Sequence, residues 1–198
     1  MSPSRPRLPR DFVLRHKRRR ILAAVAEVSA ERGYGAMKVS DIVKRAGVAR
    51  KTLYELYEGK EEVFLAAVDA AFAALLERTE EACAAGGEWD ERVRAGLAAL
   101  LGRLAEHPAE AHLLIVEAPA ATTASAARYE VARARFVTLL SEAVPAGQRR
   151  PDVLEGMIVS GVAWILNGRI RAGEAKRVND LIDDLCDFAL AHWERPVR

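Results

Sequence analysis

The chain has 198 residues, of which 51% are hydrophobic, 6% aromatic and 29% charged, with a formal net charge of +2. This length can bury a sizeable core in one domain or two small ones, and the lack of strand-like alternation favours an all-helical protein. The charge is uneven, because residues 1–60 carry 15 Lys and Arg against 6 Asp and Glu, whereas residues 61–198 carry 15 against 22. A basic end joined to an acidic body is typical of a polyanion-binding module, although a solvated basic tail gives the same count.

The compartment is predicted from cysteines and apolar runs. Cys83 and Cys186 lie far apart in apolar surroundings, which favours buried free thiols in a reducing compartment. The first ten residues lack the apolar stretch of a secretory signal, and the longest apolar run, 157–166, is too short to cross a bilayer. We therefore expect a soluble, cytoplasmic protein that makes no membrane contact.

The first half of the chain predicts a tail and four helices. Residues 1–14, rich in Pro and Arg, are expected to be a disordered basic tail. Apolar periodicity and the glycines that follow it predict helices at 14–32, 39–46, 50–57 and 60–85.

The second half predicts five more helices, which gives about nine in all. Asp90 can cap a helix over 90–106, Pro108 can open one that Pro119 stops, and further helices are expected over 125–143, 152–171 and 175–193. The small residues of 152–171 and the one-sided apolar face of 175–193 make these two helices the natural dimer surface.

Residues 37–64 are the most informative segment, because they predict two short helices joined at Gly47 and the start of a third. This arrangement is a helix-turn-helix, whose second helix is built to lie in a DNA groove. Arg50, Lys51 and Thr52 would occupy the first turn of that helix, where Arg or Lys can pair with guanine. Arg50 and Lys51 could instead be merely solvated, but beside a helix-turn-helix we favour DNA contact.

The segment resembles the tetracycline-repressor (TetR-type) family of bacterial transcriptional regulators over about residues 20–70. The resemblance lies in Gly33-Tyr34, Val39, Asp41-Ile42, Ala46-Gly47-Val48, Thr52-Leu53-Tyr54, Tyr57, Lys60-Glu61-Glu62 and Val63-Phe64. It implies a DNA-binding head over 15–60, a regulatory and dimerisation bundle over 61–198, and phosphate-clamping roles for the matching Tyr and Lys residues. The predicted DNA-binding residues are Lys38, Ser40, Arg50, Lys51, Thr52, Tyr54, Tyr57 and Lys60. For Tyr57 we expect a core ring whose hydroxyl reaches solvent or phosphate.

Three positions depart from the family pattern. Ala49 stands where Ser or Thr usually caps the recognition helix, Lys38 stands at the usual Thr cap of the preceding helix, and Leu56 replaces a frequent His or Tyr. These changes leave the fold intact and make the operator sequence unpredictable.

The regulatory half is expected to enclose a ligand pocket and to form a homodimer. Candidate pocket residues are Phe72, Trp89, Leu101, His112, Tyr129, Phe136, Trp164 and Asn167. Most could equally be ordinary core, and Asn167 is the best single candidate because a buried amide needs a partner. Candidate dimer residues are Gly156, Ser160, Ala163, Leu181, Leu185 and Phe188. No metal site and no cofactor are expected, since the His and Glu residues near 106–117 do not place three ligands on one face.

The leading hypothesis is a homodimeric repressor of a palindromic operator in double-stranded DNA, released by a small apolar effector. The alternatives are a DNA-binding protein of the same fold without ligand control, and an activator. An enzyme is not expected, because no nucleophile elbow, phosphate-binding glycine loop or metal spacing is found. The effector and the controlled genes are not specified by the sequence.

Overall fold

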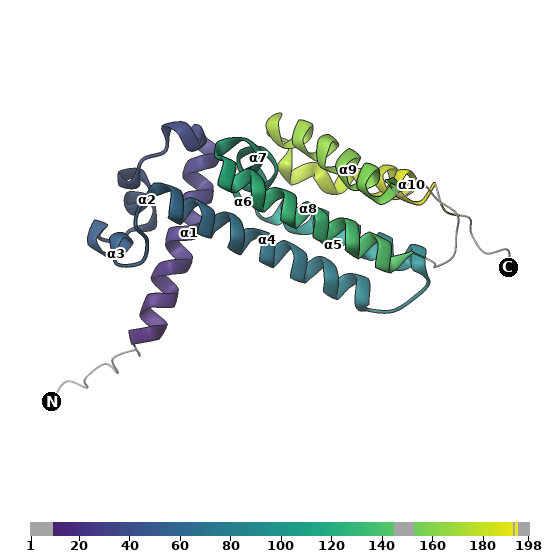
Figure 1. Ribbon diagram of the computed structural model, residues 1–198, viewed down its shortest axis with the longest axis horizontal. Coiled ribbons are helices and arrows are strands. Elements are labelled where there is room, and N and C mark those ends of the chain that lie inside the picture. Colours follow the sequence, from purple (N-terminus) through teal and green to yellow (C-terminus); the bar gives the residue numbers. More distant parts are fainter. Residues whose placement is uncertain (1–9, 145–152, 192, 194–198) are drawn as a thin grey trace. The chain divides into compact units, whose positions relative to one another are not determined.

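The computed structural model describes residues 10–144, 153–191 and 193 (Figure 1). All regular secondary structure in this part of the chain is helical, which confirms the predicted all-α class. The chain divides into two compact units, Met1–Ala67 and Val68–Arg198. The first nine residues of the predicted basic tail lie outside the described residues.

The first unit consists of α1 (Arg10–Ala36), α2 (Val39–Ala46), α3 (Arg50–Tyr54) and the start of α4 (Lys60–Ala84). α1 packs against α2 and α2 against α3. The core of the unit is formed by large buried side chains from all four helices, which include Ile21, Val25, Ile42, Leu53 and Phe64. In α1 and α4 the buried residues recur at three- and four-residue spacing, so each of these two helices turns one apolar stripe inward.

The helix boundaries of this unit differ from the predicted ones at two places. α1 begins at Arg10 rather than near Leu14, so residues 10–14 are helical and not part of a disordered tail; neither Pro nor Gly interrupts the chain between 10 and 32. Regular geometry breaks at Gly33, where φ is 73°. α3 ends at Tyr54, although the Tyr57 N–H still donates to the Leu53 carbonyl at 2.8 Å.

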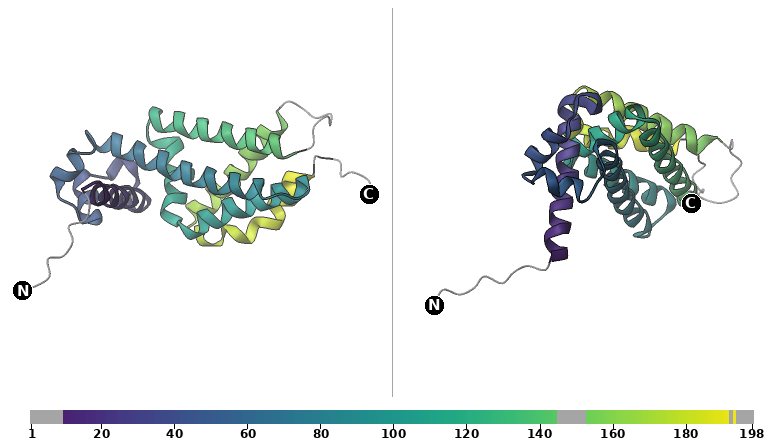
Figure 2. Two further views of the ribbon diagram at one scale, coloured as in Figure 1. Left: turned by 90° about the horizontal axis from the view of Figure 1, so that it is seen from below. Right: turned by 60° about the vertical axis from the view of Figure 1, so that its left-hand side comes forward.

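The second unit begins with residues 68–84 of α4 and continues through α5 (Trp89–Glu106), α6 (Pro108–His112), η1 (Leu113–Glu117), α7 (Ala118–Ala121) and α8 (Thr123–Ala143). Figure 2 shows α8 running beside α4, and two ion pairs of 2.8 Å, Arg128 to Asp69 and Arg135 to Glu80, join the two helices.

The chain continues with α9 (Leu154–Arg171), η2 (Ala175–Leu181) and α10 (Ile182–Leu190). α9 packs against α8, and η2 with α10 packs against α5. The predicted ninth helix is thus a 3₁₀ segment followed by an α-helix. A tryptophan pair, Trp89 and Trp193, with ring centroids 6.0 Å apart, closes one end of the core together with Val93, Leu154 and Ile158.

Pro119 does not stop the predicted sixth helix, contrary to expectation. The helix passes through a π-helical stretch, η1, and Pro119 lies in the first turn of α7, where its ring fits. Pro119 has no N–H for the carbonyl four residues before it, which is that of Ile115. The Asn167 side-chain amide donates to this oxygen at 2.7 Å, so a residue of α9 supplies the hydrogen bond that the proline cannot make.

Within the described residues, no helix is both long and apolar enough to span a bilayer.

Candidate nucleic-acid interface and apolar cavity

The helix-turn-helix is set by local backbone geometry at its two joints. Gly47 ends α2 in the left-handed conformation, with φ 59°, and its N–H donates to the Lys44 carbonyl. At the start of α2 the Asp41 carboxylate accepts the Lys38 backbone N–H at 3.2 Å, which satisfies a helix-start group although Lys38 cannot cap the helix itself. Ala49 gives α3 no side-chain cap, as the sequence predicts.

Two of the three predicted base-reading side chains of α3, Arg50 and Lys51, lie on its exposed surface with Tyr54. Arg50 and Lys51 are both exposed. The Arg50 guanidinium donates to the Tyr54 hydroxyl at 3.2 Å and lies 5.5 Å from the centroid of its ring. Because this contact orders two long side chains before any ligand arrives, less entropy is lost when they bind. Lys51 makes only a distant contact of 4.0 Å with Glu55.

Two of the predicted contact residues are instead core. Thr52 is 8% exposed and Tyr57 is 5% exposed, because both turn toward the inner face of the head. The Tyr57 hydroxyl is buried and has no hydrogen-bond partner among the described residues. It therefore does not reach solvent, contrary to the prediction. In this conformation both side chains are largely shielded from a ligand at the surface.

The remaining predicted contacts lie at helix starts. Lys38 and Ser40 are exposed at the beginning of α2. Lys60, at the first position of α4, donates to the Tyr34 carbonyl at 3.0 Å, and its ammonium lies 4.2 Å from the Tyr34 ring centroid. An ammonium has three donors, so Lys60 keeps donors for a phosphate while Tyr34 fixes its position.

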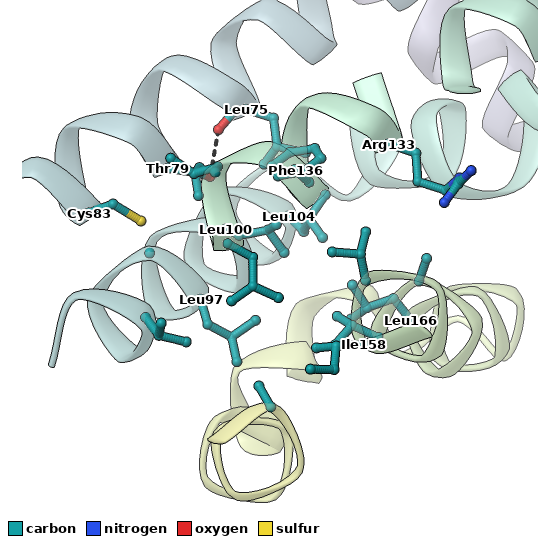
Figure 3. A pocket seen from close by; sticks show the side chains of 18 of the residues that line it. Leu75, Thr79, Cys83, Leu97, Leu100, Leu104, Arg133, Phe136, Ile158 and Leu166 are labelled. Carbon is teal, nitrogen blue, oxygen red and sulfur yellow. Dashed lines mark hydrogen bonds between the residues drawn. The ribbon is translucent and has the colours of Figure 1, made fainter. Parts of the chain in front are cut away.

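The second unit encloses an apolar cavity of about 130 Å³ between α4, α5, α8 and α9, with Ile115 of η1 and Ala189 of α10 also in its wall (Figure 3). Its walls are mostly aliphatic, and prominent members are Leu75, Leu97, Leu100, Leu104, Leu139, Ile158, Val162 and Leu166. The polar side chains in the lining are Thr79, Cys83, Tyr129 and Arg133. Thr79 is satisfied by the Leu75 carbonyl at 2.8 Å, and Arg133 pairs with Glu130 at 2.7 Å.

Burial governs the titration of the two weak acids in the lining. It raises the pKa of the Cys83 thiol and, with Glu130 acting in the same direction, raises the pKa of the Tyr129 hydroxyl. Both groups are therefore neutral at physiological pH, and Arg133 is the one charged side chain among the lining residues.

Three of the eight predicted pocket residues, Phe72, Tyr129 and Phe136, do line this cavity. Trp89 packs with Trp193 instead, and Leu101 is fully buried outside the lining. Trp164 is 79% exposed, because it lies on the outer face of α9.

His112 and Asn167 are also outside the lining. Burial lowers the pKa of His112, and its Nδ1 has no partner among the described residues. Asn167 is held by the Ile115 carbonyl. Sequence reasoning overlooked the cavity leucines, although the spacing of Leu97, Leu100 and Leu104 already placed them on one face of α5.

The predicted dimer residues separate into two groups. Leu181 and Leu185 are buried in the core of their own chain, and Ala163 faces the cavity, so these three assignments are corrected. Gly156 is half-buried with open space around it, Ser160 is exposed, and Phe188 is 40% exposed against Gly161. The exposed stripe of α9 and α10, with the residue before α9, contains further apolar side chains that were not among the predicted dimer residues, namely Val153, Met157 and Trp164.

The chain is similar in sequence to bacterial transcriptional regulators. Residues 21–67 match the family model of bacterial regulatory proteins, tetR family. The transcriptional activator FasR of Mycolicibacterium smegmatis is 32% identical over 111 residues, 56% of this chain and 48% of its own length. The chain therefore aligns with about half of this relative.

Solved structures share the fold at low identity. The fatty acid degradation regulator FadR of Bacillus halodurans has a TM-score of 0.78 at 18% identity and covers 89% of this chain and 99% of its own. FadR of Bacillus subtilis, solved in complex with stearoyl-CoA, has a TM-score of 0.75 at 18% identity with the same coverage of both chains. These structures show that the fold is shared, and the match to the tetR family of bacterial regulatory proteins covers the helix-turn-helix, residues 21–67.

Proposed function

We propose that this protein is a sequence-specific DNA-binding transcriptional regulator, a homodimeric repressor released from its operator by a small apolar effector. The observation that carries the proposal is the exposed Arg50, Lys51 and Tyr54 face of α3, directly after the Gly47 turn. A short helix that presents Arg and Lys from its first turn matches the way recognition helices read the major groove.

The cavity supports control by a ligand over the alternative of a constitutive DNA-binding protein. Its volume of about 130 Å³ exceeds the roughly 10–15 Å³ that one water needs by the same measure. An aliphatic wall stays dry or takes an apolar guest, and we propose a fatty acyl chain as the effector class. The stearoyl-CoA complex of the structurally similar FadR points in the same direction.

The proposed control is a shift between two conformers. The effector would favour the one in which α4 is tilted and the two heads of the dimer no longer match the groove spacing. Moving such a population from 1:99 to 99:1 takes about 5.5 kcal/mol of differential affinity. Linkage requires that operator DNA weaken effector binding by the same factor.

The DNA-binding role is tested with an operator selected from randomised duplexes. Arg50→Ala and Lys51→Ala should each weaken operator binding by about 5- to 150-fold, the equivalent of about 1–3 kcal/mol for a bidentate base contact. Lys176→Ala, which removes an exposed cation from the second unit, should leave it unchanged. Operator binding that is insensitive to both α3 variants would refute the assignment of the reading helix.

The effector class is tested by titrating stearoyl-CoA and stearate into the purified protein by isothermal calorimetry. Leu100, whose side chain points into the cavity (Figure 3), is replaced by Trp to fill the space. We expect binding to the wild type and at least about tenfold weaker binding to Leu100→Trp, since an overfilled cavity excludes the chain. Val131→Trp, on the exposed face of α8, is the control. If Leu100→Trp binds as tightly as the wild type, the ligand does not occupy this cavity.

The sign of regulation depends on where the operator lies relative to the promoter. FasR is named an activator, so activation is the second candidate. A reporter placed behind the selected operator distinguishes the two, because deletion of a repressor raises expression and deletion of an activator lowers it. We also propose that the cavity binds its ligand without catalysis, since its lining is mostly aliphatic.

A further inference from the structure

The N-terminal turns of α1 carry a run of cations that precedes the segment matched by the tetR family model, residues 21–67. We propose that this run, Arg15–Arg20, forms a second DNA-contacting surface that binds backbone phosphates without regard to sequence. We call it the α1 basic segment. The proposal rests on the proposed DNA-binding function and extends it to residues that the family match does not include.

The cations of the α1 basic segment are exposed or half-exposed and have no acidic partner among the described side chains. Arg15, Arg18 and Arg19 are exposed and Lys17 is half-exposed. No described carboxylate lies within 4.0 Å of any of them, and Arg19 contacts only the His16 ring, at 3.4 Å.

In the second unit, by contrast, most of the described arginines form ion pairs. Those that form ion pairs with a carboxylate are Arg78, Arg94, Arg103, Arg128, Arg133, Arg135, Arg169 and Arg177. Among the described residues, cations without a carboxylate partner are more numerous in the head than in the second unit, and in the head a polyanion can take the place of the missing partners.

The clustered cations of the α1 basic segment destabilise α1 when no DNA is bound. Arg15 and Arg19 stand four residues apart on α1, where like charges repel. Phosphates of a bound DNA strand would attract these cations and offset the repulsion between them. A merely solvated helix start would gain nothing from adjacent arginines at these positions.

The segment also ends beside the reading helix. Arg20 reaches from α1 to the turn between α2 and α3, where its guanidinium donates to the Gly47 carbonyl at 3.1 Å. This contact joins the basic segment to the turn that leads into Arg50 within one compact unit. Phosphates that flank the bases read by α3 are therefore the occupants that fit this surface.

The test uses a fluorescein-labelled 30-bp duplex of mixed sequence and the full-length protein, with anisotropy titrations between 50 and 200 mM NaCl. The variant is Arg15→Ala/Arg18→Ala/Arg19→Ala. A charge-matched control removes three exposed cations from the second unit, Arg171→Ala/Lys176→Ala/Arg177→Ala. Circular dichroism checks that each variant keeps its helix content.

We expect the slope of log K against log[NaCl] to become shallower by about 2–3 in the α1 variant, since each phosphate contact contributes about 0.9. The wild type should then lose about 15- to 60-fold more affinity than the variant between the two salt concentrations. The control should keep the wild-type slope. Replacing the same three arginines by Lys should also keep it, because the contact needs charge rather than geometry.

The outcomes separate this inference from the function on which it rests. An unchanged slope in the α1 variant, or an equal change in the control, would overturn the second surface while leaving α3 as the reader. A wild-type protein that shows no salt-sensitive binding to any duplex, and an operator selection that yields none, would instead overturn the DNA-binding function itself.

Discussion

At the scale of single residues, Gly47 is fixed by its backbone and by its neighbour. Its φ of 59° is left-handed, and a Cβ added there would lie 2.5 Å from Nη2 of Arg20. We predict that Gly47→Ala destabilises the protein by about 1–2 kcal/mol, because an L-residue is strained in that conformation. The drop in unfolding free energy is measured by urea titration followed by circular dichroism. Gly35→Ala, with ordinary φ and open space, should change it by less than about 0.5 kcal/mol; equal effects would contradict the explanation.

Gly96 lets α4 and α5 approach closely in the wall of the cavity. A Cβ at Gly96 would lie 2.3 Å from the Cys83 Sγ and 3.6 Å from the Thr79 Cγ2. We predict that Gly96→Ala costs about 1–3 kcal/mol of stability, as overpacking in a closed core does. Cys83→Ala removes the clashing sulfur, so the double variant should be more stable than the sum of the two single changes implies.

The double-mutant cycle for this pair is measured by thermal unfolding. Gly102→Ala, on the same helix with its nearest neighbour atom at 3.6 Å, is the control and should be nearly neutral. Strict additivity of the Gly96 and Cys83 changes would show that the sulfur is not the obstacle.

At the scale of elements, the hydrogen bond between Asn167 of α9 and Ile115 of η1 offsets the proline in α7. We predict that Asn167→Leu destabilises the second unit by about 1–3 kcal/mol, because a partly buried carbonyl loses its side-chain donor. Asn167→Asp should also destabilise it, since a carboxylate cannot donate to the same oxygen. Thermal unfolding measures both.

The control for this element is Asn179→Leu, which replaces an exposed amide of η2 whose side chain has no hydrogen bond to another described residue. Because Ile115 lines the cavity, the Asn167 variants should also have a changed affinity for stearoyl-CoA if that ligand occupies the cavity. Unaltered stability in Asn167→Leu would mean that another group satisfies the Ile115 carbonyl.

Helix existence was predictable from the sequence, whereas local exceptions were not. Periodic apolar residues and glycine stops predicted α2, α4 and the regular part of α1 closely, since both signals are local. Pro119 misled the prediction because its compensation comes from Asn167, which is 48 residues away in the sequence. A signal of that kind exists only in the folded chain.

Site residues could likewise be predicted where they depend on the local sequence, and could not where they depend on contacts between distant segments. The exposed face of α3 could be predicted from the turn at Gly47 and the helical period. The walls of the cavity could not, because they depend on which stripes of α4, α5, α8 and α9 meet. Trp164 and Leu185 illustrate this: an aromatic taken for pocket lies outside, and a leucine taken for interface lies inside.

At the scale of the whole molecule, the exposed stripe of α9 and α10 is the surface proposed to hold two copies together. Met157 and Trp164 lie two helical turns apart on α9, with the small Ser160 between them, and Phe188 of α10 packs against Gly161 beside them. An exposed aromatic in such a stripe is the kind of side chain that dominates binding energy when an interface forms. A charge in its place would have to be buried without a partner.

We therefore predict that Trp164→Glu turns a dimer into a monomer in sedimentation velocity at micromolar concentration. The fold should survive, because a side chain that is 79% exposed contributes little to the core of its own chain. Val131→Glu, a 73% exposed apolar residue on α8, should remain a dimer. The monomer should bind a single half-site as the wild type does but lose its advantage on a palindrome, because only a dimer can hold two heads about 34–36 Å apart. A Trp164→Glu protein that still sediments as a dimer would place the interface elsewhere, and the spacing of the heads would then have to be set by another surface.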